Sequence, residues 1–96
     1  MKQYYVDFTK AKTMWYFHEA WQKGLQPTLD GTVGENLDAL WDCLTDMETP
    51  CKVTLKGLDK LARDLKDEAN TMLKIFERAV EWYKEISMHF EFEVID

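Results

Sequence analysis

The chain has 96 residues, of which 46% are hydrophobic and 14% aromatic, and this suits one folded domain with a single core, spanning residues 1–96. No segment is long and apolar enough to cross a bilayer, and the amino terminus lacks the apolar run and cleavage site of a signal peptide, so we expect a cytoplasmic protein. The net charge of −6 argues against nucleic acid and anionic membranes as partners.

The predicted elements begin with a strand at residues 4–8, where apolar and polar side chains alternate. A helix is expected over about 11–23, because apolar residues recur there at steps of three and four. Gly24 can adopt the left-handed conformation that closes a helix. Pro27 then predicts a loop, since proline blocks a helix and the Asp-Gly pair that follows it favours a turn.

The segment GENLDALWDCLT, residues 34–45, has the pattern of an amphipathic helix. At about 100° per residue its apolar side chains fall on one side: Leu37, Leu40, Trp41 and Leu44. The opposite side is acidic and carries Glu35, Asp38, Asp42 and Asp46. The start of the helix stays open, because Thr32 can cap it together with Glu35, whereas Gly34 can delay it.

The second half of the chain is predicted to contain two strands and two helices. Alternating residues predict strands at 51–55 and 88–94, a short helix is expected at about 58–66, and the longest apolar stripe predicts a helix over about 68–85. Three strands joined by helical crossovers should pair in parallel. We therefore expect a two-layer α/β domain, in which about four helices pack on one face of a three-stranded parallel sheet whose strand order is not readable.

The alternation within each strand indicates that the second face of the sheet meets water. Lys52 and Lys56 belong to this face. There they could neutralise Glu91 and Glu93 of the last strand.

Catalytic and metal-binding patterns are missing from the sequence. Cys43 and Cys51 lie too far apart for a CxxC redox pair, so we expect buried free thiols. His18 and His89 have no second histidine or cysteine at ligand spacing, so we expect neither a metal nor a cofactor. Two carboxylates can act as acid and base, but those of the acidic helix share one exposed environment, so we expect no enzymatic activity.

The negative charge is concentrated in one segment. Six of the 18 acidic residues lie between Lys23 and Lys52, where there is no basic residue, and the others are balanced by the 12 lysines and arginines elsewhere. The six are Asp30, Glu35, Asp38, Asp42, Asp46 and Glu48. An acidic helix face is often only a solvated surface, but like charges at four-residue steps repel, here at a cost of about 1 kcal/mol. A basic partner would remove this cost, and carboxylates along a helix can imitate the phosphates of a nucleic acid.

Residues 34–45 resemble the central motif of the barstar family, and looser similarity extends along the whole chain. It includes His18, Trp21, Leu25, Val53, Phe76 and Ala79. The resemblance implies a barstar-like fold and an intracellular inhibitor. The acidic helix and the loop before it, about residues 32–47, would occupy the phosphate-binding active site of a basic, secreted, guanyl-specific ribonuclease of the barnase type. It also implies a one-to-one complex formed by a monomer.

The resemblance assigns roles to individual residues. Asp42 would enter the phosphate-binding pocket of the ribonuclease, and Asp38 would make the second acidic contact. Other positions at or beside the family's interface are Val33, Gly34, Asn36, Leu37, Trp41 and Thr45. For Leu37 and Trp41, packing in the core explains the residue types equally well.

Several positions depart from the family's pattern. Thr32 and Val33 stand where the family has two tyrosines, and the loop before the helix is longer. Met47 replaces a tryptophan, and Arg78 replaces a contact glutamate. These departures leave the target ribonuclease and the affinity open. They also keep an alternative in view, a non-enzymatic adaptor that binds a different basic protein through the same helix.

Overall fold

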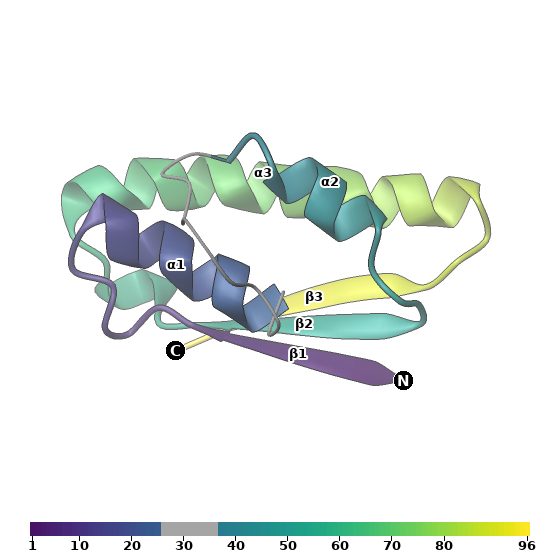
Figure 1. Ribbon diagram of the computed structural model, residues 1–96, viewed down its shortest axis with the longest axis horizontal. Coiled ribbons are helices and arrows are strands. Elements are labelled where there is room, and N and C mark those ends of the chain that lie inside the picture. Colours follow the sequence, from purple (N-terminus) through teal and green to yellow (C-terminus); the bar gives the residue numbers. More distant parts are fainter. Residues whose placement is uncertain (26–36) are drawn as a thin grey trace.

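A three-stranded parallel sheet forms one layer of the computed structural model, which describes residues 1–25 and 37–96 (Figure 1). The strands are β1 (Lys2–Asp7), β2 (Cys51–Lys56) and β3 (Phe90–Ile95). They lie in the order β1-β2-β3 with both pairs parallel. This confirms the predicted pairing and supplies the order that the sequence left open.

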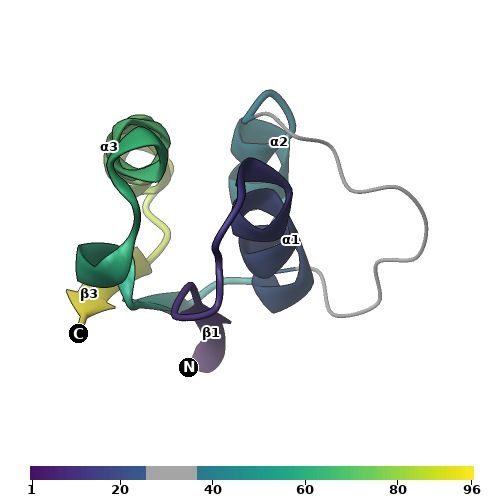
Figure 2. The same cartoon turned by 90° about the vertical axis from the view of Figure 1, so that its left-hand side faces the viewer.

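The helices of the described residues form the second layer. They are α1 (Met14–Leu25), α2 (Leu40–Thr45), α3 (Arg63–Glu85) and the short 3-10 helix η1 (Leu58–Lys60). Figure 2 shows α1, α2 and α3 on the same side of the sheet, with α3 above β3, while α1 packs on β1. This arrangement confirms the expected two-layer α/β fold, with three α-helices and η1 in place of the four or so predicted helices.

The core lies between the two layers, because the periods of strand and helix each place one apolar face there. In β2 every second side chain is buried, and its register with β1 and β3 points their corresponding side chains the same way. α3 meets this face with buried residues at steps of three and four: Leu65, Ala69, Met72, Phe76, Ala79 and Tyr83. The Phe76 ring packs against Phe90 and Phe92, with centroids 6.3 and 5.2 Å apart, which places α3 over β3.

The opposite face of the sheet is not covered by any helix of the described residues, as the alternating strands predicted. Lys52 Nζ lies 3.2 Å from Glu93 Oε1 across β2 and β3, which confirms one of the expected ion pairs. Lys56 lies opposite Asp7 of β1. Hydrogen bonds from Thr9, together with the charge of Lys56, hold the pKa of the Asp7 carboxyl below its usual value.

α1 begins and ends later than the periodicity predicted, and Gly24 has another role. The Thr13 hydroxyl caps the helix by accepting a hydrogen bond from the Tyr16 N–H at 3.3 Å. Gly24 lies inside the helix and not at a left-handed end, so that prediction was wrong. Its missing side chain instead lets α1 approach β1, since a Cβ there would lie 2.7 Å from Val6 Cγ2 and 3.0 Å from the Tyr5 carbonyl oxygen.

The two helices expected at 58–66 and 68–85 are replaced by η1 and the single long helix α3. Gly57, with a φ of 88°, turns the chain directly after β2 into η1, and α3 follows after extended residues. Leu65 is fully buried one helical turn before Ala69, on the same stripe. The apolar pattern therefore runs through the boundary that was expected near residue 67.

Candidate binding surface

α2 is held in place by its apolar side and by α3. Leu40 and Leu44 are fully buried, and Cys43 is buried beside them. The Tyr83 hydroxyl of α3 donates a hydrogen bond to the Leu44 carbonyl at 2.6 Å, satisfying one of the carbonyls left unpaired at the carboxyl end of a helix. Burial raises the pKa of this hydroxyl, so it stays protonated at neutral pH and remains a donor.

The acidic helix expected over residues 34–45 is shorter than predicted. α2 begins only at Leu40, whose N–H donates to the Leu37 carbonyl at 3.0 Å in the turn before the helix. Asp38 therefore lies in this turn, and Asp46 follows the end of α2, so the acidic residues do not share one continuous helix. The remaining positions of this prediction lie outside the described residues: Thr32, Val33, Gly34, Glu35 and Asn36.

Asp38, Asp42 and Asp46 are all exposed. Within residues 1–25 and 37–96, no lysine or arginine lies within ion-pair distance of Asp42 or Asp46. Asp42 thus presents a carboxylate from a helix whose opposite side is anchored in the core. Such a group accepts strong hydrogen bonds from a cationic partner.

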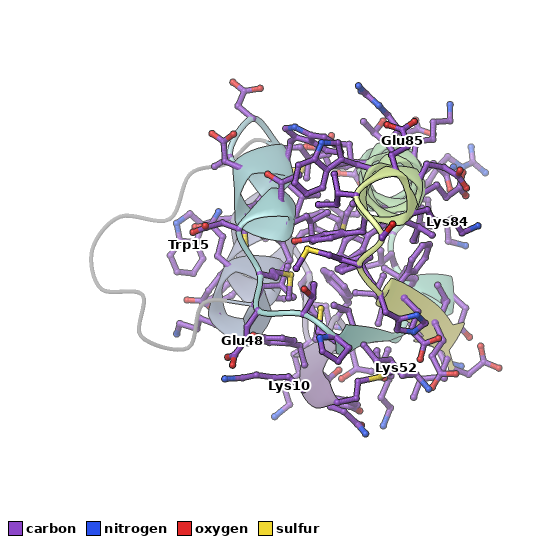
Figure 3. The ribbon with its side chains drawn as sticks, turned by 90° about the vertical axis from the view of Figure 1, so that its right-hand side faces the viewer. Lys10, Trp15, Glu48, Lys52, Lys84 and Glu85 are labelled. Carbon is purple, nitrogen blue, oxygen red and sulfur yellow. The ribbon has the colours of Figure 1, made fainter. Side chains whose placement is uncertain are left out.

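A hollow of about 490 Å³ opens beside Asp42. It is lined by Tyr4, Leu25, Ala39, Asp42, Cys43, Asp46, Met47 and Glu48. Glu48, which Figure 3 shows on the segment below α2, also forms an ion pair with Lys2 at 3.2 Å. The sequence does not predict Tyr4 and Leu25 as neighbours of the acidic residues, because only the fold brings β1 and the end of α1 beside α2.

The side of α2 that faces α3 is aromatic. Leu37 and Trp41 are half-buried, so each contributes both to packing and to the surface. The Trp41 ring packs edge to face against Trp82 of α3, with centroids 6.3 Å apart, and the Arg78 guanidinium lies over the same ring, 5.3 Å from its centre. Thr45 is half-buried and donates a hydrogen bond to the Trp41 carbonyl at 2.9 Å. The sequence gives no sign of the contact with Arg78, which depends on how α2 lies against α3.

His18 and the two cysteines, which the sequence analysis considered for metal or redox chemistry, lie in the core. His18 is fully buried, with Nε2 2.9 Å from a Glu68 carboxylate oxygen and Nδ1 2.9 Å from the Trp21 indole nitrogen. Cys43 and Cys51 are buried thiols that form no disulfide, as expected. In the part of the chain that the structure describes, no three His, Cys, Asp or Glu side chains are grouped to hold a metal ion, and no helix is long and apolar enough to span a membrane.

The similarity of this chain to known proteins covers nearly its whole length. A family model described as Barstar (barnase inhibitor) matches residues 1–95. The match includes all of the strands and helices described above, so it extends far beyond the motif at residues 34–45.

Proposed function

This chain belongs to the barstar family, and we propose that it inhibits a ribonuclease of the barnase type by placing Asp42 and Asp38 in the basic active site of the enzyme. The observation that carries the proposal is the exposed Asp42 carboxylate, which has no lysine or arginine within ion-pair distance among the described residues. Sites that bind the phosphates of RNA are built from clustered lysines and arginines. Asp42 would accept charge-assisted hydrogen bonds from such a cluster.

The proposed contact spans about residues 32–47. Asp42 is its main anchor and Asp38 its second acidic contact. The surrounding residues are Val33, Gly34, Asn36, Leu37, Trp41 and Thr45. In this proposal the protein acts in the cytoplasm as a monomer, forms a one-to-one complex with a secreted type of ribonuclease, and neither catalyses a reaction nor needs a cofactor.

The anchoring of α2 supports this function energetically. Because Leu40 and Leu44 are buried and Tyr83 binds the end of the helix, Asp42 is already positioned and loses little conformational freedom on binding. Binding to cations also removes the repulsion between neighbouring aspartates. The net charge of −6 attracts a basic ribonuclease over longer distances and speeds the encounter.

Inhibition titrations with barnase and with other basic secreted ribonucleases test the proposal. We expect a stoichiometric loss of RNA cleavage, weakened about 100-fold or more by Asp42→Ala and about 10-fold by Asp38→Ala. The physical reason is that each change leaves a cationic group of the ribonuclease buried without its partner. Circular dichroism checks that each variant keeps its fold.

Asp59→Ala is the matched control for these variants. It also removes one negative charge, but from η1, which follows the end of β2, whereas α2 precedes the start of this strand. Inhibition should change less than about 2-fold. If Asp42→Ala inhibited every responsive ribonuclease as well as the wild-type protein does, the assignment of this site would be wrong.

Met47 and Arg78 favour a second candidate function, because both differ from the family's pattern. Met47 lines the hollow beside Asp42, and Arg78 lies over the neighbouring Trp41. The alternative is an adaptor that binds another basic protein through the same surface. Affinity capture from the native host, with Asp42→Ala as the control bait, separates the two functions. Recovery of ribonucleases that depends on Asp42 supports inhibition, whereas recovery of only other proteins supports the adaptor.

A further inference from the structure

Arg78 places a positive charge over Trp41, the residue before Asp42. It extends from the exposed side of α3, and its guanidinium carbon lies 5.3 Å from the centre of the Trp41 ring. Trp41 directly precedes Asp42 on α2 and packs edge to face against Trp82, which holds the ring beneath the cation. The guanidinium therefore lies over the residue that precedes Asp42, on the side of α2 that faces α3.

The sequence of α3 offers Arg78 a different partner. Glu81 lies at the spacing of a helical ion pair with Arg78, yet its carboxylate lies 3.6 Å from Lys84 Nζ. In residues 1–25 and 37–96, no carboxylate is within ion-pair distance of Arg78. The contact with the ring engages the positive charge, but it gives none of the five N–H donors a carboxylate acceptor.

We propose that Arg78 determines which ribonucleases this protein binds, by pairing with a carboxylate at the rim of the partner's active site. The inference rests on the proposed function and adds the chemistry of the partner: a basic centre opposite Asp42 and an aspartate or glutamate opposite Arg78. A planar guanidinium already held by Trp41 loses little freedom when it binds a carboxylate through two parallel hydrogen bonds. A ribonuclease with a lysine or arginine at that position is repelled, so the same residue excludes other partners.

Dissociation constants for a ribonuclease that the wild-type protein inhibits test this role. Arg78→Glu should weaken binding about 30-fold or more, and Arg78→Gln about 3- to 10-fold. Lys74→Glu is the matched control, because Lys74 is also exposed on α3, one turn earlier, and the change in net charge is the same. This control should weaken binding less than about 3-fold.

Alanine replacement of the acidic residues around the ribonuclease's active site then locates the group that meets Arg78. One of these replacements should lose most of its effect when it is combined with Arg78→Gln, with a coupling of about 5-fold or more in the dissociation constant. A residue that only covered Trp41 would show no such coupling. In that case Arg78→Gln and Arg78→Glu would bind the ribonuclease equally tightly, and any loss of affinity would parallel a loss of thermal stability.

The outcomes separate this inference from the proposed function. If Arg78→Glu bound as tightly as the wild-type protein, or more tightly, while Asp42→Ala was weakened, the role of Arg78 would be overturned and inhibition through Asp42 would stand. If neither change weakened binding, both would be overturned.

Discussion

His18 is fully buried, yet both of its ring nitrogens have hydrogen-bond partners. The indole N–H of Trp21 can only donate, so Nδ1 of His18 accepts this bond. The ring proton is therefore assigned to Nε2, which donates to Glu68 and joins α1 to α3. This role accounts through packing for a histidine to which the sequence analysis assigned no ligand.

Replacing His18 with leucine should lower the free energy of unfolding by about 2 to 3 kcal/mol, because the Trp21 N–H is left buried without an acceptor. Urea unfolding followed by fluorescence measures this change. His89→Leu is the control, since His89 is exposed beside Glu91 at 3.4 Å, and its effect should stay within about 0.5 kcal/mol. Equal losses in the two variants would show that the buried hydrogen bonds of His18 are not the cause.

At the scale of the elements, close contacts fix how each helix lies. α1 approaches β1 at Gly24, where no side chain separates the helix from the strand. α2 is fixed through the hydrogen bond between Tyr83 and the Leu44 carbonyl. Each contact joins residues far apart in the sequence, so neither the ends nor the placement of these helices follows from local periodicity.

Gly24→Ala should lower the free energy of unfolding by about 1 to 3 kcal/mol, although the same change in an open helix position adds about 1 kcal/mol. The reason is that the new Cβ would lie 2.7 Å from Val6 Cγ2. Adding Val6→Ala removes this clash, so the double variant should be more stable than the sum of the two single effects predicts. Strictly additive effects in urea unfolding would contradict the clash.

The parts of the fold that could be predicted from the sequence have local causes. Period-two alternation located the strands, and the helical segments between them indicated parallel pairing. The positions of Asp38 and Asp42 opposite buried leucines indicated that both are exposed. The start of α2 and the single helix α3 were missed, because their ends depend on extended and turn residues whose conformation is set by the surrounding fold. The contact between Arg78 and Trp41 was missed because it arises only when α2 lies on α3.

At the scale of the whole molecule, the net charge of −6 is unevenly distributed. Outside the segment between Lys23 and Lys52 the charges balance, and several form pairs such as Lys52 with Glu93. Inside it, Asp42, Asp46 and Glu48 line the same hollow beside α2. The free protein therefore retains a repulsion that a basic partner relieves.

Salt should consequently act in opposite directions on the free protein and on its complex with a ribonuclease. Raising KCl to about 0.5 M screens the aspartates from one another and should raise the melting temperature of the free protein by about 2 to 5 °C. The same salt should weaken the complex about 10-fold or more. Combining Asp42→Asn with Asp46→Asn should reduce both responses, and unchanged responses in this variant would place the repulsion elsewhere in the molecule.

The two sides of α3 have different roles, because one side maintains the fold and the other carries Arg78. Phe76 and Ala79 are fully buried, whereas Arg78, next to Ala79 in the chain, reaches across to Trp41. Substitutions at such exposed positions change stability by about 0.5 kcal/mol or less. Under the proposed function, a lineage of inhibitors can therefore follow a diverging ribonuclease by exchanging the residue at position 78, while Asp42 and the core beneath it stay the same.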